Sequence, residues 1–174
     1  MKKKIVSVIV CMLASLTITT VAFADDTRAV IPGNYRFISS AMNGEYLNAY
    51  TDGVPVAGTR VTTYSYTGHL TQQWIAVRQT TDRYVIEPAA YQLAGTPLVV
   101  CNVGNTAYLQ PLNNVSIPDR QVKLVDEGNG KTGIALVDRS APFLALTATE
   151  IPMKAGGHSV AWGGSSGLSN QLWR

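Results

Sequence analysis

The chain has 174 residues, of which 46% are hydrophobic and only 14% are charged. Its formal charge of +3 comes from Lys2, Lys3 and Lys4, so the remainder is neutral, with 11 basic and 11 acidic residues. This balance leaves no basic cluster after residue 4 that would predict binding to nucleic acid or to an anionic membrane surface.

The N-terminus predicts a secretory signal peptide. Its three lysines precede a mostly apolar stretch from Ile5 to Val21, and Ala22-Phe23-Ala24 gives a small-x-small cleavage pattern. A membrane anchor is the alternative, but about 17 apolar residues is the short limit for spanning a bilayer, and no stop-transfer pattern follows. We therefore expect residues 1–24 to be removed after Ala24, which leaves a secreted chain of residues 25–174 without membrane insertion.

One cysteine, Cys101, remains after residue 24. An intramolecular disulfide is therefore impossible in the mature chain, and we expect the fold to be held by its core. Because Cys101 follows Val99-Val100 in an apolar run, the sequence favours a buried small hydrophobe over a reactive thiol.

Short β-type runs, separated by Gly, Asn, Asp and Pro, follow an expected unstructured lead-in over residues 25–31. No segment has the period of a convincing amphipathic helix. We therefore predict an all-β chain of about 12 strands. These strands are Tyr35–Ser39, Tyr46–Ala49, Arg60–Tyr64, Gln72–Arg78, Tyr84–Glu87, Leu98–Asn102, Ala107–Leu112, Gln121–Val125, Gly133–Val137, Phe143–Leu146, Ser159–Trp162 and Gln171–Trp173.

A glutamine recurs at a nearly constant interval. Gln72, Gln121 and Gln171 are separated by 49 and then 50 residues, and Trp74 and Trp173 follow the first and third glutamines by two positions. Residues two apart on a strand point to the same face, so each Gln-x-Trp pair is expected to share one face. We expect both tryptophans to be buried anchors of the core.

The interval divides the chain into three units of four strands. Glu45–Ala49 is matched with residues 142–146, and Val61–Tyr64 with Ser159–Trp162. Three such units predict a β-trefoil, in which six strands form a short barrel and six more cap it as hairpins. A propeller has similar units but normally needs at least four of them. The expected domain is 25–174, with repeats at about 33–80, 81–128 and 129–174.

The first repeat contains one extended pattern, which consists of Tyr35-Arg36-Phe37-Ile38, Gly44, Leu47-Asn48-Ala49, Gly58-Thr59, Val61-Thr62-Thr63-Tyr64 and Gln72-Gln73-Trp74. This pattern resembles the ricin-type (R-type) β-trefoil lectins, and the resemblance extends over the mature chain in three copies. It implies one shallow sugar site per repeat. In such a site an aspartate accepts hydrogen bonds from sugar hydroxyls, an aromatic side chain stacks on the pyranose, and an Asn and a Gln complete the polar contacts.

In the first repeat the resemblance implies a site made of Asn48, Tyr64 and Gln72. Asn48 stands where the aspartate is expected and loses its charge-assisted bonds, while Thr71 replaces the Asn. Asp52 could supply the carboxylate instead. The alternative is structural, with Tyr64 as an ordinary strand aromatic and Asn48 as a turn residue.

In the third repeat the implied site contains Trp162, Asn170 and Gln171, with Ala145 at the aspartate position. A glycine- and serine-rich stretch follows Trp162, so an exposed indole is expected; the alternative is that it fills the base of the trefoil. The middle repeat is expected to be structural only, because Lys123 replaces its tryptophan.

The residues predict a binding protein rather than an enzyme. His69 and His158 are the only histidines and lack a metal-ligand spacing, and no nucleophile or phosphate-loop motif is present. We therefore expect no catalysis, no cofactor and no metal. The predicted function is a secreted carbohydrate-binding lectin with one or two shallow sites of roughly millimolar affinity. Its partners would be glycans or glycoconjugates, and a homodimer would add avidity.

Two other functions fit the same fold. One is a β-trefoil protease inhibitor, for which Pro88–Thr96 or Pro111–Asp119 would be the bait loop. The other is the glycan-binding subunit of a larger toxin or adhesin assembly.

Overall fold

The computed structural model describes residues 29–30, 36–37, 44–90, 96–137, 144–164 and 168–174. The predicted signal peptide and most of the predicted strand Tyr35–Ser39 lie outside these residues, as does part of the loop Pro88–Thr96.

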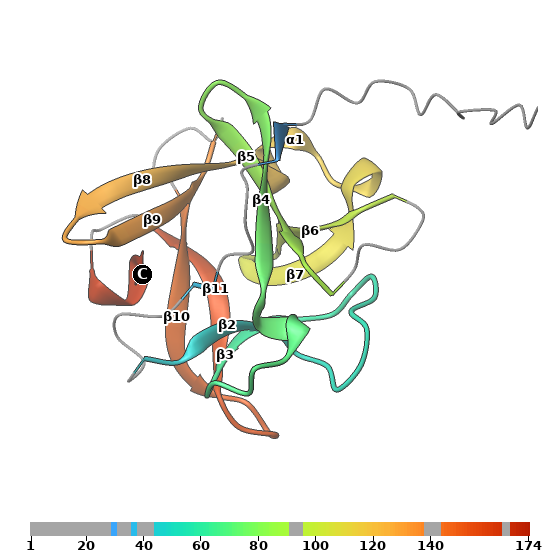
Figure 1. Ribbon diagram of the computed structural model, residues 1–174, viewed down its shortest axis with the longest axis vertical. Helices are drawn as coiled ribbons and strands as arrows, with labels where there is room; N and C mark the ends of the chain where they lie inside the picture. The colour runs from blue at the N-terminus through green and yellow to red at the C-terminus, as the bar shows by residue number, and fades with distance from the viewer. Residues whose placement is uncertain (1–28, 31–35, 38–43, 91–95, 138–143, 165–167) are drawn as a thin grey trace, which may run out of the picture.

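The described residues form one curled sheet of twelve strands, so the predicted all-β class is confirmed (Figure 1). Nine strands lie in the order β1-β4-β5-β8-β9-β10-β11-β3-β2, while β12 pairs with β9 and the β6–β7 hairpin joins through β11. The elements are β1 Ala29–Val30, β2 Tyr46–Ala49, β3 Val61–Tyr64, η1 Leu70–Gln72, β4 Trp74–Thr80, β5 Arg83–Pro88, β6 Leu98–Val103, β7 Thr106–Pro111, η2 Leu112–Asn114, α1 Ile117–Arg120, β8 Val122–Gly128, β9 Lys131–Leu136, β10 Leu144–Pro152, β11 His158–Gly164, η3 Ser169–Gln171 and β12 Leu172–Trp173.

Two local predictions were wrong. Ala29–Val30 was expected to be unstructured, but it forms β1 and pairs with Val77 and Arg78 of β4. Gln72 and Gln171 were expected on strands, but each ends a short 3-10 turn, and the strand begins after it. The turn reverses the chain and brings each glutamine amide to the carbonyls of the preceding loop, which a straight strand could not do.

The architecture is that of a β-trefoil. The hairpins β4–β5 and β8–β9 build the barrel and are joined by the pairing of Tyr84 with Val122. The hairpins β2–β3, β6–β7 and β10–β11 meet at the other end (Figure 1). There, β11 pairs with both β3 and β7, and an isolated bridge joins Arg60 to Tyr108.

Equivalent hydrogen bonds place the third repeat 99 residues after the first. The indole nitrogen of Trp74 donates to the carbonyl oxygen of Leu47 at 3.0 Å, and that of Trp173 donates to Leu146 at 3.0 Å. The same offset relates the amides of Gln72 and Gln171, which donate to the carbonyl oxygens of residues 65 and 164.

This offset corrects the predicted match between the repeats. The counterpart of Glu45–Ala49 is 144–148 rather than 142–146. The counterpart of Val61–Tyr64 is 160–163 rather than Ser159–Trp162.

The middle repeat follows the first by 48 residues. The amide of Ala89 donates to Gln73, and the amide of Val137 donates in the same way to Gln121. Gln121 is therefore the counterpart of Gln73, and the prediction that it stands in register with Gln72 is wrong. Arg120 occupies that place, and its guanidinium donates to the Leu112 carbonyl just as Gln72 reaches the carbonyl of Tyr64.

The hydrophobic core fills the barrel and the base of the cap. The three repeats contribute residues to it at equivalent positions. Val61 and its counterparts Leu109 and Val160 are all fully buried. Trp74 and Trp173 are also fully buried, which confirms their prediction as core anchors, and the middle repeat places Val122 where they stand.

Candidate functional site

The first hairpin has one face toward the core and another toward the outside of the cap. Leu47 on β2 is fully buried in the core, and alternation along the strand turns Tyr46 and Asn48 the other way. Tyr64 on β3 lies opposite Tyr46 and therefore shares its face. We call Tyr46, Tyr64 and Tyr66, which follows β3, the tyrosine face.

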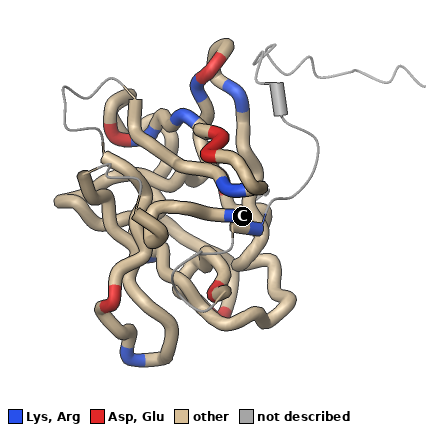
Figure 2. The backbone as a smooth tube through the Cα atoms, turned by 90° about the vertical axis from the view of Figure 1, so that its left-hand side faces the viewer, with Lys and Arg blue, Asp and Glu red and all other residues tan. Residues whose placement is uncertain are grey.

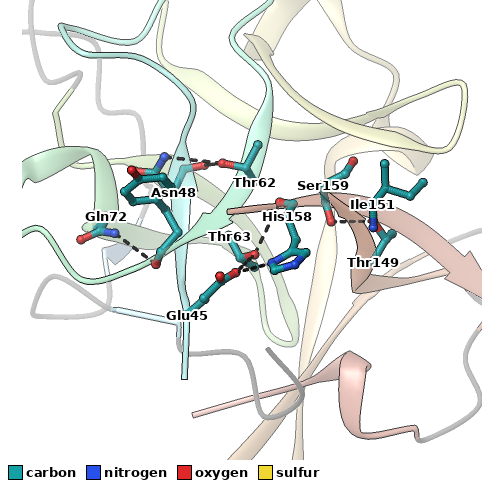
Figure 3. A network of polar contacts seen from close by, with 10 residues as sticks. Glu45, Asn48, Thr62, Thr63, Gln72, Thr149, Ile151, His158 and Ser159 are labelled. Carbon is teal, nitrogen blue, oxygen red and sulfur yellow. Dashed lines mark hydrogen bonds and ion pairs between the residues drawn. The ribbon is translucent and has the colours of Figure 1, made fainter. Parts of the chain in front are cut away.

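Asn48 lies on this side of the hairpin but is closed off. Its side chain is 8% exposed, and its amide nitrogen donates to the hydroxyl of Thr62 at 3.5 Å. Figure 3 shows the two side chains facing each other across β2 and β3. The amide is therefore used inside the hairpin rather than presented to a ligand.

Tyr64 is half-buried because its ring lies against the turn between β10 and β11. A Cβ added to Gly156 would lie 3.0 Å from the ring, and one added to Gly157 would lie 2.9 Å from it and overlap the Thr63 carbonyl. The two glycines, both at positive φ, thus leave room for the Tyr64 ring to lie directly against the turn. Part of the ring remains accessible on the tyrosine face.

Tyr66 is the member of the tyrosine face that the sequence prediction did not include. Its side chain is 57% exposed, yet its ring centroid lies 4.9 Å from that of Tyr46 at an interplanar angle of 39°. The guanidinium carbon of Arg36 lies 5.8 Å from the Tyr66 ring centroid. The repeated Tyr-x-Tyr at the end of β3, opposite Tyr46 at the start of β2, was the signal that could have revealed it.

Gln72 holds the loop that carries Tyr66. It is fully buried, and its amide oxygen accepts hydrogen bonds from the backbone nitrogen of Thr67 at 2.8 Å and from its hydroxyl at 3.0 Å. Its amide nitrogen donates to the Ser65 carbonyl at 2.8 Å. The predicted site residue Gln72 is therefore placed as a support of the loop, with its polar atoms occupied by the protein.

A polar link joins the first and third hairpins on the opposite face of β2 (Figure 3). One carboxylate oxygen of Glu45 accepts a hydrogen bond from the Thr63 hydroxyl at 2.5 Å and lies 2.8 Å from Nδ1 of His158. The Glu45 side chain is 16% exposed and that of His158 is 33% exposed. Because Glu45 and Leu47 lie on the same side of β2, this link supports the hairpin from behind the tyrosine face.

The third repeat does not reproduce this arrangement. Trp162 is 2% exposed and its indole nitrogen donates to the Cys101 carbonyl at 3.1 Å, so the expectation of an exposed indole was wrong. The 99-residue offset explains this, because Trp162 is the counterpart of the inward-facing Thr63. The positions equivalent to Tyr46 and Tyr64 are Ala145 and Gly163.

The two polar residues predicted for the third repeat, Asn170 and Gln171, both lie in η3. Gln171 is 4% exposed, and its amide nitrogen donates to the Gly164 carbonyl at 2.7 Å and to the Thr147 hydroxyl at 3.2 Å. Asn170 is half-buried, and its side-chain oxygen is buried without a hydrogen-bond partner in the described residues. A small pocket beside them is lined in part by Glu127, Ala145 and Gln171.

Two ionisable groups away from the tyrosine face have shifted pKa values. Burial and the nearby carboxylate of Asp119 raise the pKa of the Cys101 thiol to about 12, in agreement with the predicted unreactive cysteine. A hydrogen bond from Lys123, at 2.8 Å, lowers the pKa of the exposed Asp82. Figure 2 shows the charged residues in small groups, with long uncharged stretches of chain between them.

Metal-ligand clusters and membrane-spanning helices were sought among the described residues. The His, Cys, Asp and Glu residues among them nowhere gather in threes that could hold an ion. Among the same residues, no helix has the length and apolar character needed to cross a bilayer.

No protein-family model and no curated protein matches the sequence. Several solved structures match the fold at identities below 25%. The designed threefold-symmetric protein ThreeFoil matches with a TM-score of 0.65 and 21% identity over 81% of this chain and 96% of its own. The C-half of an earthworm R-type lectin, in complex with GalNAc, matches with a TM-score of 0.59 and 20% identity over 82% and 97%.

A mosquitocidal holotoxin matches with a TM-score of 0.64 and 12% identity over 83% of this chain, which corresponds to only 17% of the toxin. These likenesses, together with the strand pairing and the threefold hydrogen-bond pattern, show that the chain has the β-trefoil fold.

Proposed function

We propose that the protein is a secreted, non-catalytic carbohydrate-binding protein and that its sugar site is the tyrosine face of the first repeat. The observation that carries this proposal is Tyr66, which is 57% exposed although Tyr46 and Arg36 hold its ring in place. A sugar ring presents C–H groups on one side, and a fixed, exposed aromatic ring is a suitable surface for them.

The fold supports the same function. The earthworm lectin half is similar to the chain over 97% of its own length, and its structure is a complex with GalNAc. A shallow face binds a single sugar weakly, at roughly millimolar affinity, so useful binding would need several linked sites. A homodimer or a larger assembly would provide them. The match to 17% of a holotoxin chain supports the second of these arrangements as a variant of the same function.

The proposed site differs from the one implied by the sequence resemblance. Tyr64 stays in it and Tyr66 joins it, whereas Asn48 and Gln72 support it from within the fold. The third repeat offers Ala145 and Gly163 at the positions of Tyr46 and Tyr64, so we place one site on each chain.

A glycan array on the mature protein tests the proposal, with Tyr66→Ala as the site variant. Ile117→Ala is the matched control, since it removes another exposed apolar side chain, from the middle repeat. We expect glycan binding by the parent chain and by Ile117→Ala, and its loss in Tyr66→Ala with an unchanged circular dichroism spectrum. An array without hits, or a Tyr66→Ala variant that binds normally, would contradict the assignment.

The protease-inhibitor alternative is tested by a protease panel. Its candidate loop Pro111–Asp119 contains η2 and most of α1, and Asp119 accepts hydrogen bonds from Asn102 at 3.2 Å and Ser116 at 2.6 Å. A bait loop must offer an extended backbone, so this folded loop does not favour inhibition.

A further inference from the structure

We propose that the tyrosine face selects a pyranose that carries an anionic group, either a carboxylate or a sulfate, and that Arg36 binds this group. The inference rests on the proposed sugar-binding function and narrows its ligand class. It starts from the position of Arg36, whose guanidinium carbon lies 5.8 Å from the ring centroid of Tyr66. That distance is within the range of a cation–π contact.

A cation–π contact at this distance engages the charge of the guanidinium and uses none of its N–H groups as donors to a polar atom. Arg36 and Tyr66 are both exposed, so these N–H groups are accessible from solvent. Tyr46, 4.9 Å from Tyr66, keeps the ring from moving away. The result is a cation held at one place beside an aromatic surface, with less freedom to lose when a ligand binds.

The charge of Arg36 is not cancelled by a carboxylate in the described part of the chain. The two pairs found there join Lys123 to Asp82 and His158 to Glu45. Glu45 adjoins Tyr46 in sequence, but its carboxylate is engaged by Thr63 and His158 behind the tyrosine face.

The guanidinium of another arginine, which is partly buried, is engaged by its own hairpin. Arg78 folds back on its own hairpin, where Nε donates to the Thr80 carbonyl at 3.0 Å and a terminal nitrogen donates to the Thr81 carbonyl at 2.8 Å. Two of its N–H groups thus donate to backbone carbonyls, whereas the Arg36 guanidinium lies over the ring of Tyr66.

The geometry of the ligand follows from the geometry of the guanidinium. Two parallel N–H groups match the two oxygens of a carboxylate or of a sulfate, and such paired, charge-assisted bonds are stronger than bonds to a neutral hydroxyl. The sugar ring would then lie over the tyrosines while its acidic group reaches Arg36. A neutral sugar would leave the positive charge of Arg36 without an opposite charge beside it.

The test uses pairs of oligosaccharides with the same sugars and linkages that differ in the acidic group: methyl-esterified against free galacturonan fragments for the carboxylate, and desulfated against sulfated galactan fragments for the sulfate. Binding to the mature protein is measured by calorimetry between about 20 and 300 mM NaCl, because screening acts on exposed charges. We expect at least one acidic member to bind about tenfold or more tightly than its neutral partner, and added salt to reduce the difference.

Three variants assign the effect to Arg36. Arg36→Gln should abolish the preference for the acidic sugar, Arg36→Lys should keep part of it as a point charge, and Arg78→Gln should leave it unchanged. Urea unfolding of each variant checks the fold, and should Arg36→Gln prove unstable, the Lys variant and the salt dependence of the parent chain decide.

The outcomes separate this inference from the function on which it rests. Equal binding of neutral and acidic partners, or a preference that survives in Arg36→Gln, overturns the role of Arg36 and leaves sugar binding standing. Absence of binding to every fragment by a protein that binds another glycan on the array overturns the proposed ligand class alone, and absence of binding both to the fragments and on the array overturns both.

Discussion

Replacing Trp74 by alanine tests the account of the core most directly. The side chain is fully buried, and its indole nitrogen donates to the Leu47 carbonyl at 3.0 Å, which joins β4 to the first strand of the cap. The substitution removes both the apolar volume and the donor. It therefore loosens the connection between the barrel and the hairpin that carries the proposed site.

The size of the effect follows from burial. A buried tryptophan hides about 200 Å² of surface, which at about 25 cal/mol per Å² gives an upper limit of about 5 kcal/mol. Large-to-small changes of this kind cost about 3–5 kcal/mol in measured cores. The Leu47 carbonyl also loses its partner, at a cost of about 1 kcal/mol or more if water cannot reach it. We expect the free energy of unfolding to fall by about 3–5 kcal/mol, a large share of the 5–15 kcal/mol of a typical domain.

Urea unfolding followed by circular dichroism measures this loss, with Trp74→Phe as the matched variant. Phenylalanine keeps most of the apolar surface and lacks the N–H group, so we expect it to cost about 1–3 kcal/mol. Tyr66→Ala, an exposed position, should stay within about 0.5 kcal/mol of the parent chain. A Trp74→Ala variant that loses less than about 1 kcal/mol would refute the assignment, as would one that loses sugar binding while its stability is unchanged.

Three further results are expected. The raised pKa of Cys101 means that the folded state keeps its proton when the unfolded state has lost it. The stability that this difference in protonation contributes is fully present below about pH 9 and is lost as pH rises toward 12. Urea unfolding of Cys101→Ala should therefore show no such loss. Reaction of the parent thiol with a thiol reagent at neutral pH, before unfolding, would contradict the raised pKa. Gly157→Ala should destabilise clearly more than Gly130→Ala by the same measurement, because both have positive φ but only the first added Cβ meets backbone; equal losses would refute the close approach. A double-mutant cycle with Glu45→Gln and His158→Asn should give a coupling of about 1 kcal/mol, and a value near zero would show that their 2.8 Å contact adds nothing.

The sequence revealed those parts of the fold that depend on burial. Trp74 and Trp173 were recognised as core anchors because a large apolar side chain that recurs at a regular interval is typical of a core position shared by repeats. The burial of Cys101 was predicted from the apolar run that contains it, and this burial raises its pKa. The strands themselves followed from alternation and turn residues, with ends that differ by a few positions from those in the structure.

The register between repeats could not be derived from residue types. Gln121 was taken for the counterpart of Gln72 because it is a glutamine, whereas the backbone hydrogen bonds make Arg120 the counterpart. Both side chains donate to a carbonyl eight residues before them, so the structural task is shared although the chemistry differs. A motif that is defined by one residue type cannot detect such an exchange.

The same limit explains why Trp162 was predicted to be exposed. Shifting a strand by one residue turns every side chain to the other face of the sheet. The predicted match between the repeats was off by one residue, so it made Trp162 the counterpart of Tyr64 instead of Thr63. Tyr66 was missed for a related reason, since it follows the last paired residue of β3 and gains its neighbours Tyr46 and Arg36 only through folding. The prediction from the sequence and the site proposed here thus share the first repeat and Tyr64, and they differ in the side chains around it.

The two faces of the cap hairpins obey different constraints. On the inner face, the first and third repeats keep the same contacts: a tryptophan indole donates to a leucine carbonyl, and a glutamine amide closes the loop before it. On the outer face, Tyr46 and Tyr64 in the first repeat become Ala145 and Gly163 in the third. Since the third hairpin pairs normally with small residues there, the tyrosines are not needed to build the hairpin. Their presence in one repeat alone is the reason to look for a ligand at that face.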